Sequence, residues 1–265
     1  MPRRSQIQSL LRIATLFFLV GYLGLCDKAA AAPKSNSHIW IRENVSPTHR
    51  NELLRSLRRI TGLLDLNFEQ GGSLQLGSRE AAKGSTAARE LLVAATFGDS
   101  VTVIEDASSR TDVAFCKVVP GKWLHGANDR LPAFVVLIDF TDFEKVTGDE
   151  KARAAFDVGW GFLHELDHVT NDSGDSETFG TAGDCEDHIN IMRQELDLPV
   201  RTNYFFVSSS FRPDPNFSTR FVSLSFAHID RLTHKTRQYR LTWDSNQVGG
   251  FSGNGQTALV RPSSH

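Results

Sequence analysis

The pentapeptide His164-Glu165-Leu166-Asp167-His168 most restricts the fold of this chain, because its side chains can act together only on a helix. Helical residues four positions apart lie on one face, so both imidazoles can reach one metal ion. Glu165 lies beside them, where it can take a proton from a water molecule at the metal without being a ligand. The pattern predicts two zinc ligands, His164 and His168, and one general base.

The residues around the pentapeptide have helical spacing. Apolar side chains recur at steps of three and four residues, namely Ala155, Val158, Phe162, Leu166 and Val169. The sequence therefore predicts one continuous helix over residues 151–169, although Gly159 and Gly161 weaken that prediction slightly. The competing interpretation is a metal-free helix that carries two histidines by chance.

Residues 1–31 have the layout of a secretory signal peptide. Arg3 and Arg4 precede an apolar run from Leu10 to Leu25, and four alanines follow. The run is short for a membrane span of about 20 residues, which disfavours an uncleaved anchor. Leu25 is bulky where a lipoprotein signal needs a small residue before Cys26. We therefore expect a protein exported to the periplasm or the medium, with no stable membrane association after cleavage.

The mature chain is mildly acidic. Residues 1–31 carry four basic residues and one acidic residue of the 29 and 31 in the whole chain, so their removal leaves a net charge of −5. This balance does not indicate nucleic acid as a partner. The sequence names no other partner and leaves the oligomeric state open.

The remaining pattern predicts an α+β domain over residues 32–210 with a β-rich C-terminal extension over 211–265. The expected elements are a helix over 46–61, a hairpin within 64–76, a helix from Ser85 to Ala95, strands over 101–106, 113–119 and 133–139, and paired strands at 221–229 and 239–243. An exposed sheet edge beside the metal helix could hold an extended peptide by main-chain hydrogen bonds.

A third ligand is expected downstream of the histidines. Residues 171–184 are polar and acidic, which favours a solvated loop over a calcium site. A helix that Pro199 ends then carries Glu186, which can complete a three-ligand zinc site with an open fourth position. Asn190, one turn on, could orient a ligand. His188 and Glu177 remain alternatives to Glu186.

These motifs together resemble a known group of enzymes. The sequence H-E-L-x-H, an acidic segment, and then N-x-x-R-x-E-L-x-L-P-x-R with a tyrosine is similar to the short zinc metallopeptidases of bacterial effector and toxin domains. It is more remotely similar to the clostridial neurotoxin light chains. The resemblance covers residues 164–204 and implies a zincin-like fold that hydrolyses peptide bonds. It also implies that His164, His168 and Glu186 bind zinc, that Glu165 is the base, and that Arg201 and Tyr204 stabilise the tetrahedral intermediate.

Two features leave the interpretation open. The signal peptide and the long C-terminal extension depart from the effector pattern, which puts an intracellular host target in doubt. Cys116 and Cys185 are the only cysteines of the mature chain, and they are either one disulfide or two buried thiols. A zinc-stabilised binding or structural protein with a closed ligand set is the alternative function.

Overall fold

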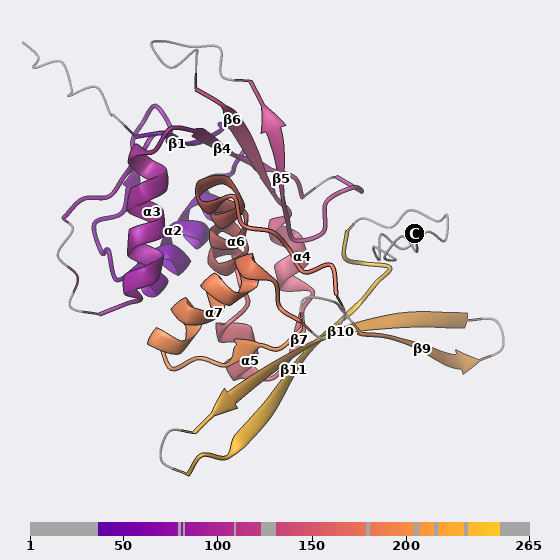
Figure 1. Cartoon of the computed structure of the whole chain (residues 1–265). Coiled ribbons are helices and arrows are strands. Elements are labelled where there is room, and N and C mark those ends of the chain that lie inside the picture. The colour runs from indigo at the N-terminus through magenta and orange to yellow at the C-terminus, as the bar shows by residue number, and fades with distance from the viewer. Residues whose placement is uncertain are drawn as a thin grey trace, which may run out of the picture. The chain divides into compact units, whose positions relative to one another are not determined.

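The computed structural model describes residues 37–249, apart from gaps at 79–80, 82, 109, 123–130, 179–180, 204–206, 215–216 and 231–232. The predicted signal peptide and Tyr204 lie outside the described residues. The architecture is mixed α and β, in agreement with the predicted α+β class (Figure 1).

One four-stranded sheet lies beside the helices, in the order β1-β4-β6-β5. Strands β1 (Ile39–Ile41), β4 (Val101–Asp106) and β6 (Ala133–Ile138) are parallel, and β5 (Cys116–Gly121) runs antiparallel to β6. The prediction of β4 and β6 is confirmed, whereas β1 was not predicted. Strand β5 begins three residues later than predicted because Phe115 has a φ of 61°, a left-handed conformation that cannot continue a pleated strand.

The N-terminal half supplies two capped helices, both confirming the sequence prediction. Helix α2 (Pro47–Thr61) begins after Ser46, whose Oγ accepts a hydrogen bond from the His49 amide, and ends at Gly62 in the left-handed region. Helix α3 (Thr86–Phe97) begins after Ser85, which caps it in the same way. The predicted hairpin between them is also present, as β2 (Asn67–Phe68) paired with β3 (Leu74–Gln75).

The predicted continuous helix over 151–169 is wrong. It is two helices, α5 (Glu150–Ala154) and α6 (Val158–Asn171), separated at Asp157. The Asp157 carboxylate accepts hydrogen bonds from the first amides of α6 and from Ser56 and Arg59 of α2, so a distant helix fixes the break. Gly159 is required there, because a Cβ on it would lie 2.3 Å from Ser56 Oγ.

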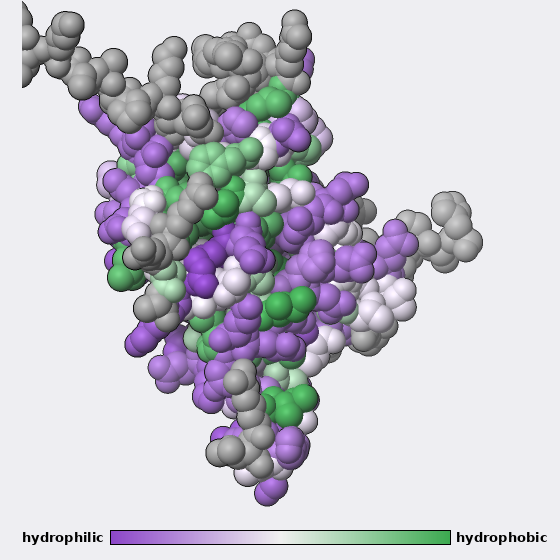
Figure 2. All heavy atoms as spheres, turned by 60° about the vertical axis from the view of Figure 1, so that its left-hand side comes forward, coloured by the Kyte–Doolittle hydropathy of each residue, from purple (hydrophilic) through white to green (hydrophobic). Residues whose placement is uncertain are grey.

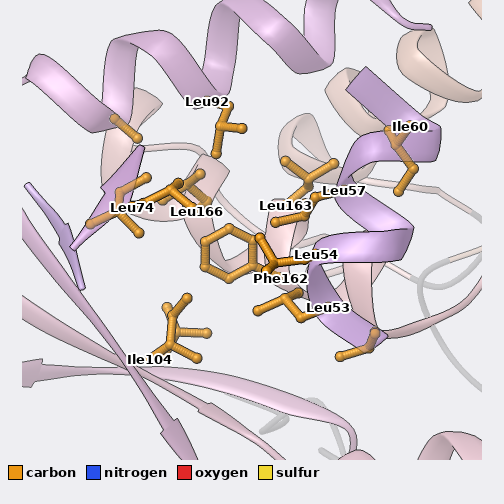
Figure 3. Packing of buried hydrophobic residues seen from close by; sticks show 14 of the residues in the cluster. Leu53, Leu54, Leu57, Ile60, Leu74, Leu92, Ile104, Phe162, Leu163 and Leu166 are labelled. Atoms are coloured by element: carbon orange, nitrogen blue, oxygen red, sulfur yellow. The ribbon is translucent and has the colours of Figure 1, made fainter. Parts of the chain in front are cut away.

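The apolar face of α6 forms the centre of the main core. Phe162, Leu163 and Leu166 are fully buried and pack among the leucines of α2 and residues from β3, α3 and β4 (Figure 3). Helix α6 therefore contacts α2, α3, β5 and β6, and it also packs on α7 (Asp184–Glu195). Because its inner face is held so firmly, its outer face presents the two histidines on a rigid support.

A second sheet is built largely from the C-terminal segment. Strand β10 (Phe217–Ile229) pairs with β9 (Val207–Asp214) and with β11 (Thr236–Asp244). The predicted pairing of residues 221–229 with 239–243 is confirmed, and the register places Val222 opposite Trp243. Two short strands from the rest of the chain complete it. They are β7 (Thr147–Gly148), which pairs with β11, and β8 (Val200–Arg201), which pairs with β10. The predicted boundary at residue 210 thus falls within β9, and the extension pairs directly with the preceding domain.

Helix α4 (Phe140–Glu144) connects the two sheets, since it follows β6 directly and precedes β7. Its buried Asp142 accepts hydrogen bonds from the amides of Phe115 and Gly249.

Hydrophilic residues spread over much of the face drawn in Figure 2 and interrupt the hydrophobic ones. In the part of the chain that the structure describes, no helix combines the length and the apolar character needed to cross a membrane.

Candidate metal centre

Four side chains converge on the outer face of α6. The ligand atoms of His164, His168, Asp175 and Cys185 all lie within 4.8 Å of one another, so this cluster could hold a metal ion. The Nε2 atoms of His164 and His168 lie 3.1 and 3.4 Å from the same carboxylate oxygen, Oδ1 of Asp175. Ligands around one tetrahedral metal ion are about 3.3–3.8 Å apart, so these two contacts are close to the spacing that a shared metal ion requires.

The loop after α6 carries Asp175 back to the histidines. Helix α6 ends at Asp172, which takes a left-handed conformation with φ 51° and reverses the chain. The loop then approaches the start of α7, where a Cβ on Gly183 would lie 2.4 Å from the Ser176 amide nitrogen. This close approach requires glycine at position 183, and it places Asp175 over the histidines.

The other nitrogens of both imidazoles are also in contact with protein groups. Nδ1 of His168 lies 2.8 Å from the Ser173 carbonyl oxygen, which can only accept, so Nδ1 carries the proton and Nε2 is left to bind metal. Nδ1 of His164 faces Cys185 Sγ at 3.4 Å and Glu186 Oε2 at 3.5 Å. Each histidine is thus oriented by a contact behind it, as is usual for metal ligands.

The surroundings of the cluster favour the protonated, positively charged forms of His164 and His168. Burial alone would lower the pKa of His168, but contacts with Asp175, Cys185 and the Ser173 carbonyl raise it to about 11. Burial likewise opposes protonation of His164, whose pKa is nevertheless raised by Asp175, Cys185 and Glu186. Metal binding would therefore displace protons from these imidazoles.

Glu165 lies beside the cluster but is not part of it. Its side chain is nearly buried, and its Oε2 accepts a 2.8 Å hydrogen bond from the Val118 amide of β5. Burial raises the pKa of Glu165 above its usual value, although the nearby His164 and His168 act in the opposite direction. A buried carboxylate with a raised pKa beside a metal site is suited to accept and return a proton.

Glu186, predicted as the third ligand, forms ion pairs with two arginines in the structure. It is buried between two guanidinium groups, with a hydrogen bond from Arg193 Nη1 and one of 2.8 Å from Arg201 Nη1. Burial would raise the pKa of Glu186, but Arg193, Arg201 and His164 outweigh it and hold the pKa well below its usual range. Its nearest approach to the cluster is the 3.5 Å contact with His164 Nδ1, which makes it an orienting group in this structure.

The remaining predicted residues have structural contacts. Arg201 is buried against Glu186 and also donates to the Asn203 carbonyl. Asn190 orients Arg193 and Arg201, because its Oδ1 accepts from both residues. His188 contacts Asp167 instead of the cluster, and Glu177 is exposed. Cys116 and Cys185 are free thiols, so of the two alternatives left by the sequence the structure shows unpaired cysteines, with Cys185 buried and Cys116 half-buried.

Asp175 and Cys185 are the site residues that the sequence did not assign. Asp175 was counted among solvated loop acids, since only the folded loop reveals its position. The signal that could have found it is the short distance in sequence, seven residues after His168.

Comparison with known proteins identifies no relative: no family model, curated protein or solved structure matches this chain.

Asp167 is the basis of a prediction about His168. Its buried carboxylate accepts hydrogen bonds from Asn171, Ser173 and His188, and Ser173 in turn holds His168. In Asp167→Asn one acceptor oxygen becomes an N–H donor, so the loop should shift and zinc affinity should fall about 10–100-fold. Competition with a chelating dye measures this, and Asp187→Asn on the exposed face of α7 is the matched control. Equal affinity in both variants would mean that Asp167 does not position the ligand.

Proposed function

We propose that this chain is an exported zinc-dependent peptidase with a zincin-like active site. The observation that carries the proposal is the meeting of His164, His168 and Asp175 around one point, with Glu165 buried beside them. Three protein ligands leave one coordination position for water or substrate, as in catalytic zinc sites. Zinc, when bound there, would polarise the scissile carbonyl and lower the pKa of water.

The protein groups would supply binding and proton transfer. Strand β5 has a neighbouring strand on one side only among the described residues, so its other edge could pair with an extended peptide. Glu165, fixed to that strand through Val118, would take a proton from the attacking water and return it to the leaving amine. Arg201 lines the same cavity as His164 and Glu165, where its positive charge would favour a developing oxyanion. The role of Tyr204 rests on the sequence resemblance alone.

The direct test is hydrolysis of a mixed peptide library by the purified mature chain. We expect cleavage that a chelator abolishes and that stoichiometric zinc restores. Library peptides that stay intact in the presence of zinc would oppose a peptidase.

One observation favours a second function, a closed zinc site with a structural role. Cys185 Sγ lies within the cluster beside His164 Nδ1, and a thiolate turned from there toward the metal would be a fourth protein ligand. The two functions differ in the behaviour of Cys185→Ala. A three-ligand catalytic site should keep its zinc and its activity in this variant, whereas a closed site should lose zinc and much of its folding stability.

A further inference from the structure

A cavity of about 160 Å³ opens beside the metal cluster. His164 and Glu165 form part of its wall, so a group bound in it lies next to the reacting atoms. Four aromatic rings form another part of the wall, and they come from four places in the chain: Phe115 before β5, Phe143 in α4, Phe156 before α6, and Trp160 in α6.

The aromatic wall is formed in advance of any ligand. The ring of Phe115 lies 5.2 Å from that of Phe143 and 5.1 Å from that of Phe156, centroid to centroid, so the three rings support one another. Phe115 holds this position with a φ of 61°, which a bulky residue rarely adopts. Backbone strain of this kind is found where a surrounding structure fixes a side chain for binding.

Part of the cavity wall is charged but internally paired. Glu186 lies between Arg193 and Arg201, and the Arg193 guanidinium also lies over the Trp160 ring at 5.2 Å. Two guanidinium groups against one carboxylate disfavour a cationic side chain beside them in the cavity. The apolar walls leave a bulky uncharged group as the best occupant.

The volume sets the size of that occupant. An apolar cavity of about 150 Å³ in another protein binds benzene, so a cavity of this size takes a single six-membered ring or a leucine-sized chain. A methyl group would leave most of the space unfilled.

We propose that this cavity is a specificity subsite that receives a phenylalanine- or leucine-sized side chain of the substrate, next to the bond that is cleaved. The assignment of a peptide substrate rests on the proposed function, whereas the binding of an aromatic ring rests on the cavity alone. The predicted substrates are therefore polypeptides cut beside large apolar residues.

Two small amides test the cavity without any turnover. We expect N-acetyl-phenylalaninamide to bind the purified mature chain at least about tenfold more tightly than N-acetyl-alaninamide, as measured by ligand-observed NMR titration. Ala114 is exposed at the rim, so Ala114→Leu should abolish this preference without disturbing the core. Ala94→Leu, at an exposed position on α3, should leave it unchanged.

A second variant changes the cavity in the opposite sense. Phe156→Ala removes one wall and should shift the preference toward N-acetyl-tryptophanamide. Equal binding of the phenylalanine and alanine amides to the unmodified chain, tighter binding of a glutamate amide, or a preference that survives in Ala114→Leu would each overturn the inference.

Peptide cleavage separates this inference from the proposed function. Cleavage without preference for phenylalanine or leucine would refute the subsite and leave the peptidase. Tight binding of the phenylalanine amide with no cleavage of any peptide would refute the peptidase, and the cavity would remain a site for aromatic ligands.

Discussion

Glu165→Gln is expected to lower the rate of peptide hydrolysis by about 10²–10⁴-fold while zinc content stays unchanged. Glutamine has nearly the same shape, and its carbonyl oxygen can still accept the hydrogen bond from the Val118 amide. What it loses is the ability to take a proton from water. Because Glu165 lies outside the cluster of ligand atoms, the metal should remain bound.

The rate and the zinc content must be measured on the same preparation. Glu177→Gln, at an exposed position in the loop after α6, is the matched control and should retain normal activity. A Glu165→Gln chain that binds zinc and cleaves peptides at the normal rate would exclude Glu165 as the base.

Glu186→Ala is expected to lower the free energy of unfolding by about 3–5 kcal/mol. The substitution leaves Arg193 and Arg201 buried beside each other without the carboxylate that both contact. Such a loss is large against the total stability of about 5–15 kcal/mol for a typical domain. Denaturant unfolding in the presence of a chelator measures it without a contribution from metal loss.

The same carboxylate predicts a pH dependence. The pKa of Glu186 is held below its usual range, so its ionised form stabilises the fold above the unfolded-state value of about 4.3. That contribution is lost as the pH falls below about 4.3 toward the folded-state pKa. Glu186→Gln should therefore show a flatter decline of stability in acid than the unmodified chain.

The matched control for Glu186→Ala is Asp187→Ala, on the exposed side of α7, which should lower the free energy of unfolding by less than about 1 kcal/mol. Equal losses from the Glu186 and Asp187 variants would refute the buried ion-pair account.

The sequence predicted those helices and strands whose ends are determined by residues close to them in the chain. Helix α2 is determined by Ser46, Pro47 and Gly62, which lie at its own ends. The break at Asp157 was missed because its carboxylate is held by Ser56 and Arg59, about one hundred residues earlier. The short strand β1 was missed because three residues carry too little periodicity to be recognised.

In the candidate site, too, the residues placed by nearby sequence could be predicted and those placed by distant contacts could not. His164, Glu165 and His168 follow from helical spacing alone. Asp175 depends on the reversal at Asp172 and on the approach of Gly183, which no periodicity encodes. Glu186 was predicted as a ligand and lies 3.5 Å from His164 Nδ1. Its partner Arg193 is two turns further along the same helix, whereas Arg201 joins them only when β8 packs on α7.

The metal content of the purified mature chain tests the central claim most directly, measured beside Asp175→Ala and Glu177→Ala. Both substitutions remove one acidic side chain from the same loop, and only Asp175 lies in the cluster. We expect about one zinc per chain in the unmodified protein and in Glu177→Ala, and a loss of most of it in Asp175→Ala. No zinc in the unmodified chain after purification in zinc-containing medium, or full retention in Asp175→Ala, would contradict the site described for His164, His168 and Asp175.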